Sequence, residues 1–141
     1  MADAKHEITI NADFKSVLEA ITTEKGLKSW WTSDVEAKPV IGSEAKFGFF
    51  NREVVFTMRI DKIAPENVEW TCVSGPDEWV GTRQKFILVA GEEKGTTSVR
   101  FTHAGWKTDS GAFPHCNTTW GHLMILLKQY VEGKNTAPYF N

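Results

Sequence analysis

The sequence has little cysteine and no long hydrophobic run, and both scarcities restrict what the protein can be. Two cysteines, Cys72 and Cys116, stand in 141 residues, too few for a disulfide framework, and we expect both thiols to be free and buried. Apolar runs such as Leu123–Leu127 reach only five residues, whereas a helix needs about 20 to span a membrane. The N-terminal MADAKHEITI also lacks a signal-peptide core. We therefore expect a cytoplasmic protein with no membrane span.

A strong basic bias is missing as well. The chain has 16 Lys and Arg against 18 Asp and Glu, for a formal net charge of −2, and the two signs are mixed. Nucleic-acid-binding domains usually concentrate basic residues in a stripe or patch, so we expect no nucleic-acid partner. We also find no nucleophile elbow, Walker loop, dinucleotide fingerprint or HExxH motif. The sequence therefore indicates no cofactor and identifies no reaction, although catalysis without a local motif stays open.

Aromatic residues, in contrast, are abundant, with six Trp and nine Phe. The 41% hydrophobic and 24% charged composition is typical of a globular protein, and residues 1–141 have the length of a single domain. Large aromatic side chains either fill a core or line a pocket for an apolar ligand. The composition alone leaves both possibilities open.

Hydrophobic periodicity predicts one strand, two short helices, about six strands and a long helix. Asp13 and Thr23 are candidate N-caps of the short helices, and Gly26 weakens the second. The long helix is expected at about 112–133, with Ser110 or Asp109 as its cap and Gly133 as its stop. Residues 134–141 form a tail, whose Tyr139 and Phe140 could fold back. The expected strands are Lys5–Asn11, Val35–Pro39, Glu44–Phe50, Glu53–Ile63, 68–72, Thr82–Ala90 and Thr96–His103.

This order of elements predicts an α+β fold in which a curved antiparallel sheet wraps around the long C-terminal helix. A sheet with one apolar face must bury that face. The long helix, whose apolar residues recur at spacings of three and four from Phe113 to Val131, is the only element large enough to cover it.

Several short motifs along the chain resemble a known family in their order and spacing. They are Gly26-Leu27-Lys28-Ser29-Trp30-Trp31-Thr32, Val40-Ile41-Gly42, Phe47-Gly48-Phe49, Val68-Glu69-Trp70, Trp79-Val80-Gly81-Thr82, Thr96 to His103, Trp120-Gly121-His122-Leu123, Leu127-Lys128-Gln129-Tyr130 and Glu132-Gly133. Together they resemble the SRPBCC superfamily of START and Bet v 1-like domains. Within it, the chain is similar to the AHSA1-like branch, which is related to the C-terminal domain of the Hsp90 ATPase activator.

The resemblance implies the helix-grip fold, β-α-α-β6-α, with a cavity between sheet and helix that in relatives holds lipids, sterols, polyketides or other apolar molecules. Some relatives are enzymes, so the family does not determine the function. The co-chaperone itself has a separate N-terminal Hsp90-binding domain, for which 141 residues leave no room, so we do not expect Hsp90 stimulation. We expect a monomer or a weak homodimer.

Candidate ligand-binding residues are those expected to point into the sheet–helix interior. The opposing interpretation is that they fill the interior completely, since protein cores pack to crystal-like density. The candidates are Trp30, Phe56, Met58, Trp70, Phe86, Phe101, His103, Trp120, Leu123, Met124 and Leu127.

His103 is the most informative polar candidate, because it shares a strand face with Val99 and Phe101. It either orients a ligand or is a buried histidine satisfied by hydrogen bonds. A metal site is not expected, since His115 and His122 lie two helical turns apart. Asp77 and Glu78 are adjacent carboxylates in an expected loop beside Trp79; paired carboxylates can do acid–base work, but adjacent ones in a solvated loop usually do not. Arg59 and Arg83 could pair with a ligand carboxylate, but we expect both to face solvent.

The main functional hypothesis is a protein that binds a small hydrophobic or aromatic ligand, lipid-like or polyketide-like, in this cavity. One alternative is an interaction module, for example a stress or chaperone accessory, with a filled core. Another is a cavity enzyme of cyclase or hydrolase type that uses His103.

Overall fold

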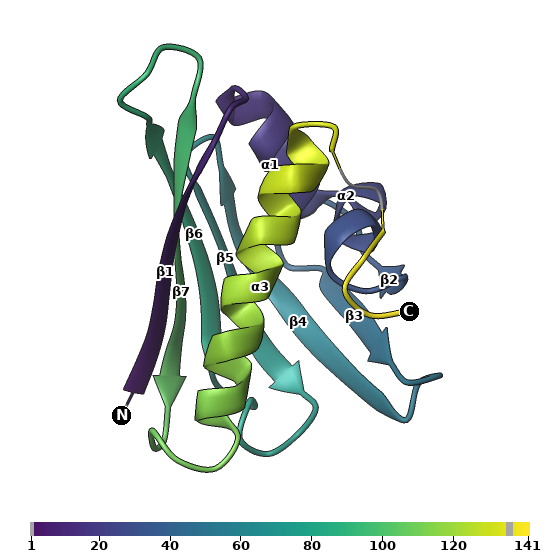
Figure 1. Ribbon diagram of the computed structural model, residues 1–141. Coiled ribbons are helices and arrows are strands. Elements are labelled where there is room, and N and C mark those ends of the chain that lie inside the picture. The colour runs from purple at the N-terminus through teal and green to yellow at the C-terminus, as the bar shows by residue number, and fades with distance from the viewer. Residues whose placement is uncertain (1, 135–136) are drawn as a thin grey trace.

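The structure is a computed structural model that describes residues 2–134 and 137–141 (Figure 1). The helices are α1 (Phe14–Thr22), α2 (Glu24–Trp30) and α3 (Phe113–Val131). The strands are β1 (Ala2–Ile10), β2 (Asp34–Glu36), β3 (Glu44–Phe49), β4 (Val54–Ala64), β5 (Asn67–Ser74), β6 (Arg83–Ala90) and β7 (Thr97–Trp106).

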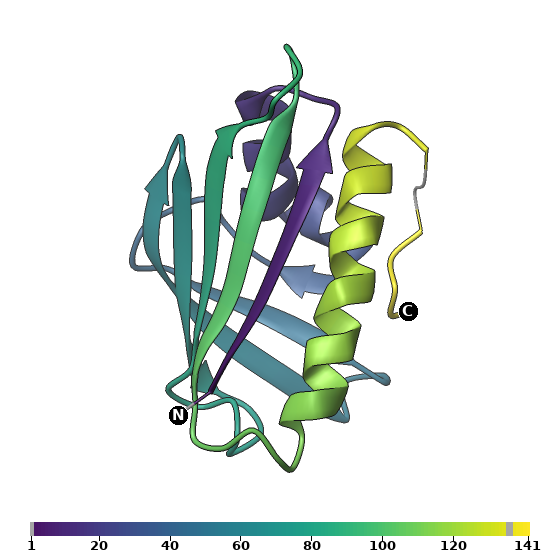
Figure 2. The same cartoon turned by 60° about the vertical axis from the view of Figure 1, so that its left-hand side comes forward.

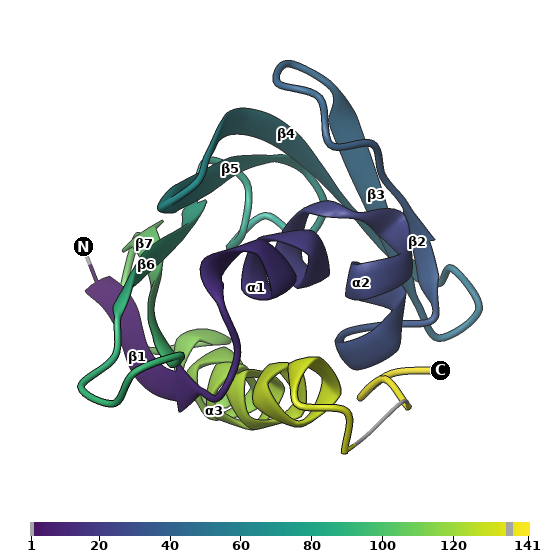
Figure 3. The same cartoon turned by 90° about the horizontal axis from the view of Figure 1, so that it is seen from above.

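All seven strands form one antiparallel sheet in the order β1-β7-β6-β5-β4-β3-β2. The sheet curls strongly, α3 lies along its open side, and α1 and α2 lie across one end (Figure 3). This arrangement confirms the predicted α+β helix-grip fold. No helix in the described part of the chain is long and apolar enough to cross a membrane.

The observed bounds of three strands differ from the predicted bounds for local reasons. β1 begins earlier and β7 ends later than expected, because the two strands pair with each other as far as Ala2 and Trp106. β2 is shorter than Val35–Pro39 because Pro39 has no N–H to donate, and the chain turns there, with the Val40 N–H donating to Lys38 O over 2.8 Å.

The short helices begin where their caps predict. Asp13 Oδ1 accepts from the Ser16 N–H over 2.9 Å, and Thr23 Oγ1 accepts from the Gly26 N–H over 3.0 Å. Helix packing requires glycine at position 26, because a Cβ on Gly26 would lie 2.7 Å from Cα of Ala20. The glycine that weakens α2 therefore allows α1 and α2 to approach closely.

The start of α3 corrects a prediction. Neither Ser110 nor Asp109 caps it; Ala112 occupies the N-cap position, without a side-chain cap of its own. Glu78, from the loop between β5 and β6, accepts from the Ala112 N–H over 3.0 Å instead. A carboxylate favours a helix N-terminus wherever it comes from in the sequence. The predicted stop is confirmed, since Gly133 has φ +78° and donates to Tyr130 O.

Candidate functional site

A pocket of about 250 Å³ lies between the N-terminal half of α3 and the ends of β3 and β4. Seven of its twelve lining side chains are those of Trp or Phe. The lining residues are Trp31, Phe49, Phe50, Val54, Phe56, Trp79, His115, Cys116, Thr119, Trp120, Leu123 and Phe140.

One wall of the pocket is a single stripe of α3. Cys116, Thr119, Trp120 and Leu123 follow one another at helical spacing and therefore face the same way. His115 stands beside them near the start of the helix and is exposed. The same stripe continues toward the C-terminus of α3 as Met124 and Leu127, which are buried in the core.

A second wall comes from the tail, which runs back alongside α3 (Figure 2) and lies beside α2 (Figure 3). The Tyr139 N–H donates to Trp30 O over 3.2 Å, and the Phe140 N–H donates to Trp31 O over 2.9 Å. These are carbonyls of the last turn of α2, which have no partner within the helix. The tail therefore caps α2 and places Phe140 against Phe49, with ring centroids 4.9 Å apart. The predicted return of the tail aromatics is confirmed.

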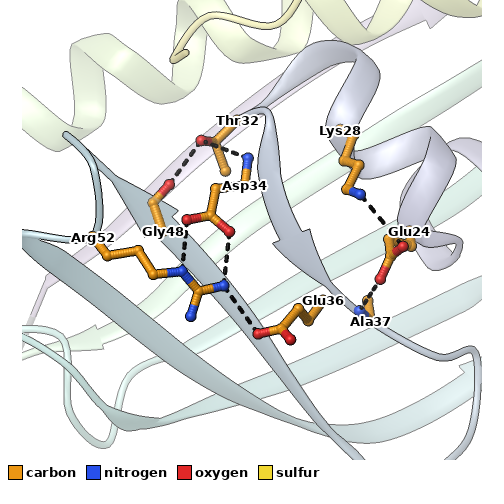
Figure 4. Close-up of polar contacts among 8 residues, drawn as sticks. All are labelled: Glu24, Lys28, Thr32, Asp34, Glu36, Ala37, Gly48 and Arg52. Carbon is orange, nitrogen blue, oxygen red and sulfur yellow. Dashed lines mark hydrogen bonds and ion pairs between the residues drawn. The ribbon is translucent and has the colours of Figure 1, made fainter.

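The rim of the pocket is a tight turn after β3. Phe50, Asn51 and Arg52 all have positive φ, of 54°, 56° and 65°, a region that bulky residues seldom occupy. Arg52 anchors this turn through two hydrogen bonds to Asp34, of 2.9 and 2.8 Å, and a third to Glu36 (Figure 4). These charged partners raise the pKa of Arg52 above its ordinary value.

Gly48 leaves the space for this anchor. A Cβ on Gly48 would lie 2.1 Å from Oδ2 of Asp34, which stands opposite it in the β2–β3 ladder. Gly48 O also accepts from Thr32 Oγ1 over 2.8 Å (Figure 4). The Phe47-Gly48-Phe49 segment thus places a ring on the pocket wall and, beside it, leaves room for the ion pair that holds the rim.

Behind the pocket the interior is filled with aromatic rings. Trp31 stacks on Trp70 at 6.2 Å, and Trp120 lies 4.2 Å from Phe101, measured between ring centroids. Phe86 contacts both Trp70 and Phe101. Each of these rings is at most 2% exposed, so the cavity that a curved sheet and helix could enclose is largely occupied by side chains.

His103 lies in this filled region, fully buried. The Trp120 indole N–H donates to Nδ1 of His103 over 3.0 Å, so Nδ1 is unprotonated and Nε2 carries the hydrogen. Nε2 lies 2.8 Å from Thr82 Oγ1. Thr82 itself donates to Trp79 O, so its hydroxyl accepts from Nε2.

Burial lowers the pKa of His103 to about 3, so the imidazole is neutral near pH 7. With both ring nitrogens engaged, His103 has no nitrogen free for a ligand. It fixes two of the rings that line the pocket, through its hydrogen bond to Trp120 and its contact with Trp79, whose ring centroid is 4.4 Å away.

The two cysteines differ in their surroundings. Cys72 is buried, and desolvation raises the pKa of its thiol to about 11. Cys116 is half-buried in the pocket wall rather than fully buried as expected. Burial raises the pKa of its thiol, a hydrogen bond with the Trp79 side chain lowers it, and the Glu78 carboxylate raises it. Both thiols are therefore protonated at neutral pH and poor nucleophiles.

The sequence-based candidates divide into two groups. Phe56, Trp120 and Leu123 line the pocket. The remainder lie in the surrounding core, outside the lining: Trp30, Met58, Trp70, Phe86, Phe101, His103, Met124 and Leu127. The Trp30 indole, for example, donates to Ala20 O between the two short helices.

Several lining residues were absent from the candidates. Trp31 follows Trp30 in the sequence, and the helix turn decides which of the two rings reaches the pocket. Phe49 continues the alternation of Phe47 along β3, a signal that could have identified it. The rim residue Phe50 depends on a positive-φ turn that no sequence pattern announces.

The polar candidates outside the pocket lie at the surface. Arg59 pairs with Asp61 at 2.7 Å, both Arg59 and Arg83 are exposed as expected, and Asp77 and Glu78 are exposed in their loop. Within residues 2–134 and 137–141, no group of three or more His, Cys, Asp or Glu side chains is placed to hold a metal ion.

Comparison with known proteins identifies a matching family model and a similar solved structure. A family model described as Activator of Hsp90 ATPase homolog 1-like protein matches residues 11–132. The solution structure of the Aha1 dimer from Colwellia psychrerythraea is similar, with 34% identity, a TM-score of 0.85 and coverage of 95% of this chain and 98% of that chain.

More distant structures share the fold. A Staphylococcus saprophyticus protein has 16% identity and a TM-score of 0.76, with 96% of this chain and 95% of that chain covered. A Mesorhizobium loti protein has 15% identity and a TM-score of 0.80, with 95% and 99% covered. A search of curated proteins finds no match.

Proposed function

The chain belongs to the family of Activator of Hsp90 ATPase homolog 1-like proteins, and we propose that it binds a small aromatic or other apolar molecule in the pocket beside α3. The observation that carries this proposal is the contrast within the interior. Aromatic rings fill most of it, yet about 250 Å³ stays open where seven aromatic side chains converge. Pockets with mostly apolar walls and few polar groups are typical ligand sites.

The size of the pocket narrows the class of ligand. Pockets for drug-sized molecules enclose roughly 300–1,000 Å³, so this one favours a molecule of one or two rings over a sterol or a long acyl chain. Burial of an apolar ring contributes about 25 cal/mol for each Å² removed from water, and aromatic contacts with the walls add to it. The cytoplasmic location expected from the sequence stays a prediction.

Naphthalene is a suitable probe for this proposal. We expect the full chain to retain naphthalene in equilibrium dialysis, and Cys116→Phe to abolish retention by placing a ring in the pocket. Ile125→Phe is the matched control, because Ile125 is 48% exposed on the same helix and does not line the pocket. Equal retention by Cys116→Phe and Ile125→Phe would show that the molecule binds elsewhere or not at all.

The enzyme alternative has less support. Catalysis through His103 would need an imidazole that reaches the ligand and exchanges protons, whereas His103 is buried behind Trp79 and Trp120 with both nitrogens hydrogen-bonded. We infer that His103 is a positioning residue. Hsp90 activation forms no part of the proposal, because nothing in the pocket supports it.

A second candidate function is self-association. The similar structure from Colwellia psychrerythraea is that of a dimer, and this chain exposes several large apolar side chains, including Phe50 at 61%, Ile41 at 60% and Ile125 at 48%. We propose a weak homodimer. Sedimentation velocity over a range of concentrations tests it, and a constant monomer mass would overturn it.

A further inference from the structure

The polarity of the pocket lining is concentrated on one wall. The groups contributed by β3, β4, α2 and the tail are aromatic or aliphatic, whereas the imidazole, thiol and hydroxyl all come from α3, as His115, Cys116 and Thr119. The indole N–H of Trp120, which borders the pocket, is already used by His103. A bound molecule therefore finds hydrogen-bonding groups at the α3 wall.

The Thr119 hydroxyl can accept a hydrogen bond from a bound molecule. Its hydroxyl donates to the His115 carbonyl over 3.1 Å, which leaves the Oγ1 lone pairs to accept a hydrogen bond. The His115 side chain, four residues earlier on the same side of α3, can donate or accept. This pair matches a group that is both donor and acceptor, such as a hydroxyl.

The charges around the pocket discriminate against an anion. Neither Lys nor Arg is among the lining residues, and Arg52 in the rim turn is already paired with Asp34 and Glu36. The nearby Glu78 carboxylate accepts from the Ala112 N–H and thereby occupies the N-terminus of α3, which could otherwise attract an anion. A carboxylate that enters the pocket would lose water without gaining a cation, which is unfavourable.

We propose that the pocket selects a neutral, planar aromatic molecule of one or two rings that carries a hydroxyl group, with the hydroxyl at Thr119 and His115 and the ring between the aromatic walls. The inference rests on the proposed binding function and specifies its ligand class. It makes Thr119 a specificity-determining residue, whereas the apolar walls supply affinity for any small ring.

Three probes of one ring system test this selectivity: naphthalene, 2-naphthol and 2-naphthoate, measured by equilibrium dialysis against the full chain at neutral pH. We expect 2-naphthol to bind about fivefold more tightly than naphthalene, since one net hydrogen bond contributes about 1 kcal/mol. We expect 2-naphthoate to bind at least about tenfold more weakly than 2-naphthol, because its charge is desolvated without a partner.

Substitutions at Thr119 test whether this residue causes the preference for 2-naphthol. Thr119→Val should reduce binding of 2-naphthol about fivefold and leave naphthalene unchanged, while Thr119→Ser should restore 2-naphthol binding. Thr118→Val is the matched control, because Thr118 makes the same type of bond, to Pro114 O, but is exposed and outside the lining.

The outcomes separate the two proposals. Retention of naphthalene with no preference for 2-naphthol, tightest binding of 2-naphthoate, or equal effects of Thr119→Val and Thr118→Val would overturn the selectivity and leave the binding function standing. Retention of none of the three probes would overturn both.

Discussion

The two halves of α3 turn the same side of the helix inward but face different surroundings. In its C-terminal half, Met124 and Leu127 are at most 2% exposed in a packed core. Toward its N-terminus, Cys116 and Thr119 are half-buried and face the pocket. The comparison teaches that an amphipathic pattern specifies which side of a helix is buried, while the element opposite decides whether that side meets a core or a cavity.

The largest expected loss of stability comes from truncating one aromatic side chain in each region to alanine. Trp70→Ala, in the filled region, should lower the free energy of unfolding by about 4 kcal/mol, because truncation of this closely packed side chain leaves a cavity among its neighbours. Phe56→Ala should lower it by about 2 kcal/mol, since Phe56 borders space that is already open and so has fewer neighbours to lose. Urea denaturation measures both. Equal losses would contradict the division into filled and hollow regions.

A pair of glycines sharpens the comparison at the backbone. Gly26→Ala should lower the free energy of unfolding by about 2 kcal/mol, because the new methyl group meets the backbone of Ala20 and forces α1 and α2 apart. Gly48→Ala should lower it by less than about 1 kcal/mol, since the methyl group meets only the movable side chains of Asp34 and Arg52, whose ion pair is at the surface.

The double variant Asp34→Ala/Gly48→Ala checks the reason for the smaller effect. If the clash with Asp34 is the cause, adding Gly48→Ala to Asp34→Ala should change the free energy of unfolding by a few tenths of a kcal/mol at most. Urea denaturation of the two single variants and the double variant gives this coupling. An undiminished loss in the double variant would place the strain at Arg52 or in the backbone instead.

The pH dependence of stability tests the buried histidine between the two regions. Since the pKa of His103 falls from 6.5 to about 3 on folding, the unfolded chain takes up a proton that the folded chain does not. Stability should therefore fall as the pH drops below 6.5, by about 1.5 kcal/mol down to about pH 5. His103→Gln should remove this part of the slope, as measured by urea denaturation at several pH values. An unchanged slope would mean that His103 is protonated in the folded state.

Local patterns in the sequence predicted most of the fold. The caps at Asp13 and Thr23 and the stop at Gly133 depend on residues within a few positions of the helix ends, and the structure has all three. The cap of α3 was missed because its acceptor, Glu78, is 34 residues away. A contact of that kind exists only once the sheet has brought two loops together.

The candidate site was harder to predict, for the same physical reason. Alternation correctly buried Met58, Trp70 and Phe101, but burial does not distinguish a core side chain from one at a pocket wall. That distinction depends on the volume left after Trp31, Trp70 and Trp120 have packed together. Phe140 reaches the pocket only because the tail caps α2, so its place depends on contacts between distant segments.

The two cysteines form a natural pair across the two regions, because one is buried in the filled interior and the other lines the pocket. Cys72→Phe should lower the free energy of unfolding by about 2 kcal/mol, since the ring must be forced into a closely packed interior. Cys116→Phe should change it by less than about 0.5 kcal/mol, because the pocket has room for the ring and burial of its apolar surface offsets the lost rotamer freedom. Urea denaturation compares the two variants at one pH. A large loss in Cys116→Phe would mean that the space beside α3 cannot accept a ring, and a small loss in Cys72→Phe would mean that the filled region is more loosely packed than its contacts indicate.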